Sequence, residues 1–158
     1  MNFAEPVSAL TALCLSALCL AGAASDLWSR RLPNWLCAAA WVAGLGFVVA
    51  DGGTAAAVSP FIHSILALIG GMVLFRFGMI GGGDAKYYAA LAAWFALDRA
   101  ILLLLCVALA GAVLVVMMLL VGTIRRQNRN DRRRTMSELP YGVAIAGGAA
   151  VTWFLGAA

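Results

Sequence analysis

Two aspartates in this apolar chain combine a side chain suited to acid–base chemistry with an unusual setting. Asp26 follows a long apolar run in the segment Ser-Asp-Leu-Trp-Ser-Arg-Arg-Leu-Pro-Asn, and Asp84 lies in Gly-Gly-Gly-Asp-Ala-Lys. A carboxylate at a membrane edge is costly unless it is paired or hydrated, which makes it a functional candidate. Two carboxyl groups close together cannot both ionise cheaply, so one serves as acid and one as base. Such a pair can activate water against an amide carbonyl and protonate the leaving nitrogen.

The residues beside each aspartate have chemistry of their own. Gly81, Gly82 and Gly83 permit positive φ and let another backbone pass closely, as an extended substrate would require. Asp84 is expected to open a helix, with Lys86 two residues further on. Asp26 is followed by a basic turn whose proline fits the first turn of the next helix. The supporting candidates in that turn are Arg30, Arg31, Pro33 and Asn34.

Each aspartate also has a plain structural interpretation. Gly-Gly-Gly-Asp before an apolar run is an ordinary helix start, with Asp84 as the N-cap. Asp26 can pair with Arg30 one helical turn later, if the helix continues that far. The residues alone leave these alternatives open. Matching depth on one side of a membrane favours the paired, chemical interpretation.

The composition is that of an integral membrane protein. Of the 158 residues, 64% are hydrophobic and 11% are charged, which is more apolar side chain than a soluble domain of this size buries. Lipid offers no partner to exposed backbone groups, so the spanning segments must be helices. The sequence therefore predicts an all-α, polytopic integral membrane protein with about six transmembrane helices in a single domain, residues 1–158.

Six apolar segments and the charges between them predict the topology. The segments are 6–25, 33–50, 58–80, 85–97, 99–123 and 139–157, of which the fourth is short. Three connections hold most of the basic residues, and we expect these on the cytoplasmic side. They contain Arg30, Arg31, Arg76, Lys86 and the six arginines of residues 125–134. Both termini are then expected outside, with Asp26 and Asp84 at the same depth near the cytoplasm.

Other residues give weaker signals. The arginine-rich connection is a short tether, which we interpret as a topology signal contacting anionic lipid and not as a nucleic-acid site. Docking of an acidic feature of a substrate is the alternative. His63, the only histidine, is expected to be buried and hydrogen-bonded. The four cysteines form no Cys-x-x-Cys pair, so we expect packing residues, no metal site and no cofactor. They are Cys14, Cys19, Cys37 and Cys106.

Three motifs in this order resemble those of the type IV prepilin peptidase family of membrane aspartic proteases. The first is an aspartate followed by a basic Pro-Asn turn, here residues 26–34. The second is Gly-x-Gly-Asp-x-Lys, here residues 81–86. The third is a late Pro-x-Gly segment, here Pro140, Tyr141 and Gly142. The resemblance covers nearly the whole chain.

The resemblance implies that Asp26 and Asp84 are catalytic and that the other motif residues support them or bind the substrate. It implies cleavage of prepilin or pseudopilin precursors, at the cytoplasmic face of the bacterial inner membrane, between a short basic leader and an apolar helix. Larger members carry a domain with paired Cys-x-x-Cys zinc motifs and N-methylate the new terminus. The chain lacks those motifs. It therefore resembles the short, peptidase-only branch of Flp-type tight-adherence (Tad) pili, for which no methyltransferase activity is expected.

Two other classes of protein are compatible with these residues. A small transporter or ion-pathway component would place Asp26 and Asp84 nearer the membrane midplane, along a path. A non-catalytic scaffold of pilus assembly would need neither carboxyl. A protease needs both carboxyls near one water molecule, open to an extended peptide from the cytoplasm. The sequence does not decide the oligomeric state or the particular precursor.

Overall fold

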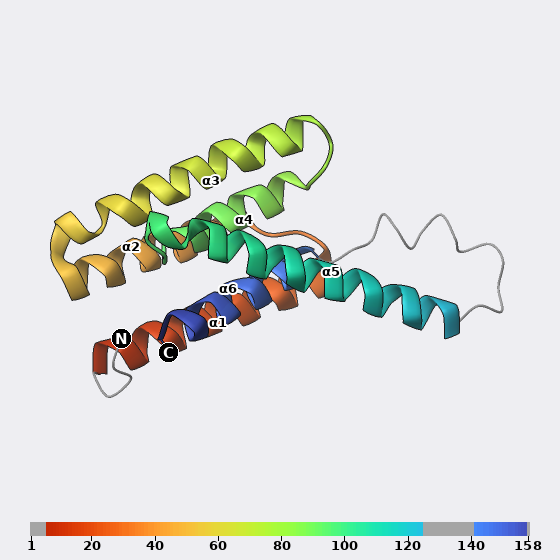
Figure 1. Cartoon of the computed structure of the whole chain (residues 1–158), viewed down its shortest axis with the longest axis horizontal. Coiled ribbons are helices and arrows are strands. Elements are labelled where there is room, and N and C mark those ends of the chain that lie inside the picture. The colour runs from red at the N-terminus through yellow and green to blue at the C-terminus, as the bar shows by residue number, and fades with distance from the viewer. Residues whose placement is uncertain (1–5, 125–140, 158) are drawn as a thin grey trace.

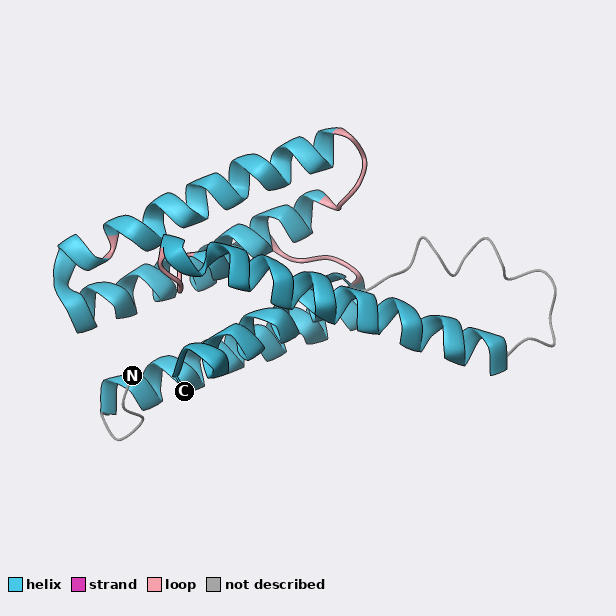
Figure 2. Cartoon of the chain, in the orientation of Figure 1, coloured by secondary structure: helices cyan, strands magenta, loops and turns pink. Residues whose placement is uncertain are grey.

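The protein is built of helices joined by short connections (Figure 2). The computed structural model describes residues 6–124 and 141–157, and this part of the chain contains no strand. The elements are α1 (Pro6–Ser29), α2 (Asn34–Ala56), α3 (Val58–Arg76), α4 (Gly82–Ala92), a short 3-10 helix η1 (Leu97–Arg99), α5 (Ala100–Ile124) and α6 (Tyr141–Ala157). These elements confirm the all-α class and correspond to the six expected segments.

Successive α-helices run in alternating directions, so their ends gather at two ends of a bundle (Figure 1). One end, which we call the motif end, holds the end of α1 with Asp26, the start of α4 with Asp84 and the start of α6 with Gly142. The opposite end holds the start of α1 and the end of α6. Two sequence motifs that are far apart along the chain therefore meet at one end of the molecule.

Four helical segments are long and apolar enough to cross a membrane. They are Ala9–Ser29, Asn34–Ala56, Val58–Arg76 and Leu97–Leu120. An α-helix needs about 20 residues to span the hydrocarbon core. With 11 residues α4 is much too short, and α6 is an apolar helix of 17 residues. The structure therefore supports a membrane protein with four candidate spans, and the predicted count of about six is not confirmed.

The short helix α4 lies inside the bundle. It packs against α2, α3 and α6, and its buried residues include Ala89, Ala90, Leu91 and Ala92. Small side chains let helix backbones approach closely where lipid provides no hydrophobic driving force between helices. Because protein surrounds α4, the helix does not have to match the thickness of a bilayer. Its buried position is the physical reason for the short fourth segment.

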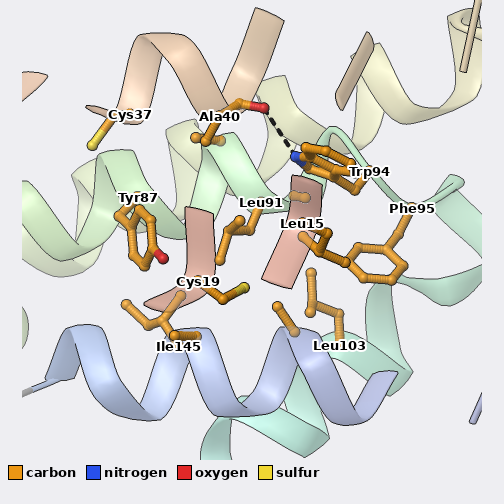
Figure 3. Close-up of a cluster of buried hydrophobic side chains, with 14 residues drawn as sticks. Leu15, Cys19, Cys37, Ala40, Tyr87, Leu91, Trp94, Phe95, Leu103 and Ile145 are labelled. Atoms are coloured by element: carbon orange, nitrogen blue, oxygen red, sulfur yellow. Dashed lines mark hydrogen bonds between the residues drawn. The ribbon is translucent and has the colours of Figure 1, made fainter. Parts of the chain in front are cut away.

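The hydrophobic core forms around α4 and the turn that follows it (Figure 3). Tyr87 is 0% exposed, and Leu91 lies beside it in the same cluster. Trp94 donates its indole N–H to the carbonyl of Ala40 on α2, at 2.9 Å. Core residues from the other helices include Leu15 and Cys19 of α1, Leu103 of α5 and Ile145 of α6. The element that carries Asp84 thus shares one core with residues of α1, α2, α5 and α6.

Two glycine pairs show where the helices touch. A side chain on Gly71 would meet the Cβ of Ala85 on α4 at 2.9 Å, whereas the space beside Gly70 is open. A side chain on Gly148 would meet the Cα of Val107 on α5 at 2.5 Å, whereas Gly147 again has nothing within 4 Å. In each pair one glycine marks a close helix contact, as small residues do in membrane proteins, and its neighbour does not.

Several local details differ from the expectations or extend them. Helix α1 continues to Ser29, so Asp26 lies on the helix and not in the turn after it. The expected outer connection around residue 52 is a kink, where Gly53 has φ 74° and ψ 179°. This conformation is essentially restricted to glycine. His63 is buried, and its Nδ1 lies 2.9 Å from the carbonyl oxygen of Phe95, consistent with a packing role.

Candidate active site

The first part of the site is the last turn and a half of α1. Asp26 is only 7% exposed although it lies close to a helix end. The helix stops at Ser29, and Arg30 takes the left-handed conformation with φ 50°, a common way for a helix to end. The hydroxyl of Ser25 donates to the carbonyl of Arg31 at 2.8 Å and so closes the turn. The carboxyl of Asp26 is therefore presented from a rigid helix.

The second part is the first turn of α4. The N-cap is Gly81 and the helix begins at Gly82, which makes Asp84 the third helical residue. Asp84 is therefore in the first turn of the helix that it was expected to open, and the alternative that it is itself the N-cap is wrong. The carboxylate folds back and accepts a hydrogen bond from the backbone of Gly81, the reciprocal half of a capping box. A Cβ on Gly81 would lie 2.6 Å from Oδ2 of Asp84.

The three glycines before Asp84 act through their lack of a side chain and not through unusual backbone angles. Gly81 has φ −74°, and Gly82 and Gly83 are helical; the positive-φ glycines of the described chain are Gly53 and Gly78. A Cβ on Gly83 would meet the Cβ of Leu32 at 3.5 Å, an ordinary contact. The expected use of positive φ at these three positions is therefore wrong.

The third part is the start of α6. The backbone N–H of Gly142 donates to Oδ2 of Asp26, at 2.7 Å. Tyr141 is the first residue of α6 and is exposed, whereas Gly142 is buried. Pro140 and the arginine-rich connection 125–134 lie outside the described residues. The structure thus joins the first and third motifs through one hydrogen bond.

The first and second motifs also meet directly. The ammonium group of Lys86 on α4 donates a hydrogen bond to the side-chain oxygen of Asn34, at 3.1 Å. Asn34 is the first residue of α2, and Pro33 is its N-cap, one residue earlier than the predicted position in the first turn. Arg30 and Arg31 are exposed beside this contact along the chain. The basic turn is therefore exposed, and a hydrogen bond from Lys86 joins its end to α4.

The two carboxyls are close enough to influence each other. Asp84 lies outside the four candidate spans. Burial and the nearby charge of Asp26 raise the pKa of Asp84 to about 6, against the lowering effect of the Gly81 backbone hydrogen bond. A raised carboxyl pKa of this kind is a common property of catalytic acids. Burial and a second carboxyl thus both favour the protonated form of Asp84.

Sequence reasoning missed a direct contact between the two helices that carry the aspartates. Tyr87 crosses from α4 to α1, donates its hydroxyl to the carbonyl of Leu18 at 3.2 Å and lies against Gly22. Gly22 is one helical turn before Asp26, and Tyr87 is nearly one turn after Asp84. Residues at these spacings share a helix face. That periodicity is the signal that could have identified the pair.

No potential metal site accompanies the aspartates in the described residues. Within residues 6–124 and 141–157 there is no group of three or more His, Cys, Asp or Glu side chains that could hold a metal ion. Cys19, Cys37 and Cys106 are buried, Cys14 is partly buried, and all four are free thiols.

Comparison with known proteins identifies the family. The sequence profile of the type IV leader peptidase family matches residues 13–116, more than half of the chain. The chain belongs to the type IV leader peptidase family. Searches of curated proteins and of solved structures gave no significant match. The resemblance inferred from the motifs is confirmed.

Membership of this family, together with the apolar helices, identifies the chain as a membrane peptidase. The family acts on precursors that carry a leader. The match includes both aspartate motifs of this leader peptidase and ends before α6. The contact between Asp26 and Gly142 thus joins the matched region to a helix beyond it. Which groups perform the cleavage, and on which precursor, are questions for the geometry and for experiment.

Proposed function

We propose that this leader peptidase is an aspartic endopeptidase in which Asp26 and Asp84 act on one water molecule. The observation that carries the proposal is that two carboxyls from different helices, Asp26 at the end of α1 and Asp84 at the start of α4, lie at the same end of the bundle. Burial and, after it, the charge of Asp26 raise the pKa of Asp84. Like-charged carboxyls within reach of each other share protons and so supply an acid and a base together. Such a pair hydrolyses an amide without a covalent nucleophile or a metal.

The surroundings suggest how the two roles are divided. Asp84 has the raised pKa, so we assign it the acid. Asp26 then accepts a proton from water while the water oxygen bonds to the carbonyl carbon of the scissile amide. The tetrahedral intermediate collapses when Asp84 donates its proton to the leaving nitrogen and the carbon–nitrogen bond breaks. Each product terminus receives one part of the water molecule, and the two carboxyls exchange protonation states.

The proposed substrate is a prepilin or pseudopilin precursor with a basic leader and an apolar N-terminal helix. Such a precursor reaches the enzyme within the bilayer, so that its cleavage site lies at the depth of the motif end. We propose the bacterial inner membrane as the location, with the motif end toward the cytoplasm. These 158 residues contain no Cys-x-x-Cys pair, which supports the peptidase-only branch of Tad pili and cleavage without methylation.

The position of the aspartates favours a protease over an ion pathway. Asp26 lies three residues before the end of α1, and Asp84 is the third residue of α4. Both are therefore at helix ends, where an extended peptide from the aqueous phase can reach them. Ionisable groups of a transport path are typically found nearer the midplane.

Paired amide substitutions test the proposal. Asp26→Asn and Asp84→Asn keep the size of each side chain but remove its acid–base capacity. Each should lower cleavage of a co-expressed prepilin, scored by gel shift of the leader, by at least about a hundredfold. The double variant should lose little more, because residues that act as a unit are not additive.

The matched control is Asp51→Asn, an exposed aspartate at the opposite end of the bundle. It should cleave at the normal rate. Full activity in either Asp26→Asn or Asp84→Asn would rule out the aspartic mechanism. Asp26→Asn that stays active but loses thermal stability would indicate a structural role for this carboxyl.

A further inference from the structure

The hydrogen bond between Gly142 and Asp26 has features of a positioning contact. It joins residues 116 positions apart, is buried, and is 2.7 Å long. Gly142 is the second residue of α6. The first N–H groups of a helix have no partner within the helix, so this amide is available to a side chain. Asp26 supplies that partner with one carboxyl oxygen, Oδ2.

The contact also leaves no space for a side chain at position 142. A Cβ there would lie 2.9 Å from the Cβ and Oδ2 of Asp26 and 3.0 Å from its Cγ. Real Cβ atoms essentially never approach other atoms so closely, so the carboxyl or the start of α6 would have to move. The Cβ of Asp26 cannot swing away by a simple rotamer change, since it is attached directly to α1. Only glycine satisfies both the hydrogen bond and the close approach.

We propose that Gly142 is a positioning residue for Asp26: its backbone N–H holds Oδ2 in place, and its missing side chain lets α6 close onto the carboxyl. The role rests on the proposed function, because it matters for catalysis only if Asp26 acts on water. The second oxygen, Oδ1, then remains for the water molecule. Helix α6 thereby becomes a third element of the active site, although it contributes no catalytic side chain.

This role gives a specific kinetic expectation. A positioning contact acts on the reacting geometry, and a misplacement of about 1 Å can cost on the order of a hundredfold in rate. Substrate binding along the apolar helices should be little affected by it. Loss of the contact should therefore lower kcat with little change in KM, whereas a general loss of folded protein would lower only the amount of active enzyme.

The first experiment compares two glycines of α6. Gly142→Ala should lower kcat for prepilin cleavage at least about tenfold, with KM within about twofold of the parent. Gly147→Ala is the matched control, because a side chain at Gly147 has nothing within 4 Å. It should leave kcat and KM unchanged. Normal kcat in Gly142→Ala would overturn the proposal.

The second experiment removes the donor without adding bulk. Replacing residue 142 by glycolic acid in cell-free translation changes the amide N–H to an ester oxygen and keeps the absence of a side chain. A hydrogen bond to a charged group is worth about tenfold in an equilibrium. We expect kcat to fall by about that factor and KM to stay constant. An ester variant with normal kcat would overturn the proposal even if Gly142→Ala failed to fold.

A third measurement separates the contact from the reaction. Gly142→Ala should lower the thermal midpoint in detergent less in an Asp26→Ala background than in the parent, because two of the three clashing atoms are gone. Strict additivity would mean that the contact is absent and would overturn the proposal. If the effects on the thermal midpoint are not additive but Asp26→Asn is fully active, the contact exists and the proposed mechanism is wrong. The catalytic role of Gly142 is then rejected with it. The two failures are therefore distinguishable.

Discussion

At the scale of single residues, each aspartate is held by the backbone of a glycine, but in different ways. Asp84 folds back onto Gly81 within its own helix, whereas Asp26 reaches across the bundle to Gly142. The first arrangement follows from a three-residue spacing that capping rules describe. The second depends on how α1 and α6 pack. Two chemically identical side chains thereby receive different surroundings.

Gly81→Ala should separate catalysis from stability. The added Cβ would lie 2.6 Å from Oδ2 of Asp84, the movable end of a side chain, so the carboxylate can turn aside at little cost to folding. We expect prepilin cleavage to fall at least about tenfold, while the thermal midpoint in detergent changes little. The comparison is Gly83→Ala, whose Cβ would make an ordinary 3.5 Å contact with Leu32 and should cost less activity. Equal activity of the two variants would contradict this assignment.

The raised pKa of Asp84 predicts a falling pH–rate profile. If the protonated form of Asp84 is the acid, kcat/KM should decline as pH rises through about 6, since this parameter reports the ionisation of the free enzyme. At pH 7 roughly a tenth of the free enzyme would carry the proton, from the same midpoint. The midpoint belongs to the coupled pair and not to one residue. A rate of prepilin cleavage that is constant from about pH 5 to about pH 8 would contradict the assignment.

The raised pKa of Asp84 also affects the stability of the folded protein. The pH dependence has the opposite sign from that of a salt-bridged carboxyl, whose pKa is lowered. The folded protein binds the Asp84 proton more tightly than an unfolded chain does, because the pKa of an aspartate in an unfolded chain is near 3.8. The contribution of Asp84 to stability is therefore fully present at low pH and is lost as pH rises toward about 6. This cost of an ionised, half-buried carboxyl is typical of a site shaped by function.

At the scale of elements, the sequence predicted the positions of the helices well and the start of α4 less well. Apolar length located all six segments, and charge placed the two aspartates at the same end. The start of α4 was set three residues too late, because Gly82 and Gly83 were interpreted as loop although they are helical. Glycine has low helix propensity, so successive glycines did not indicate the first turn of a helix. The contact between Tyr87 and Gly22 depends on how α1 and α4 pack, which apolar patterning does not supply.

The contact between α3 and α4 gives a test at this scale. Gly71→Ala would place a Cβ 2.9 Å from the Cβ of Ala85 and 3.2 Å from its Cα. Ala85 follows Asp84 directly, so the change should both destabilise the protein by about 1–3 kcal/mol, as overpacking does, and lower cleavage. Gly70→Ala is the adjacent control with open space and should be neutral or slightly stabilising, since alanine favours helix. Similar thermal midpoints for both variants would show that the helices are not in close contact at this point.

At the scale of the whole molecule, the proposed active site is assembled from three helix ends that are distant in sequence. The end of α1, the start of α4 and the start of α6 meet at the motif end. The alternation of charges was enough to place the first two together, because positive residues mark one side of a membrane. It could not place Gly142 beside Asp26, since that requires the packing of α6 against α1. Overall arrangement was therefore predictable from composition and charge, and the atomic contacts were not.

The orientation of the bundle is the remaining expectation for the whole molecule. Arg30, Arg31, Arg76 and Lys86 lie at the motif end, and Arg99 lies at the other, so the motif end should face the cytoplasm. The test uses single cysteines in a variant whose four native cysteines are replaced by serine. Met79→Cys, in the exposed α3–α4 turn, should react with a membrane-impermeant maleimide only after intact cells are permeabilised. Asp51→Cys, exposed at the opposite end, should react without permeabilisation. The reverse pattern would put the aspartates on the outer side, away from a precursor whose basic leader remains in the cytoplasm, and would exclude the proposed cleavage even if both carboxyls were correctly paired.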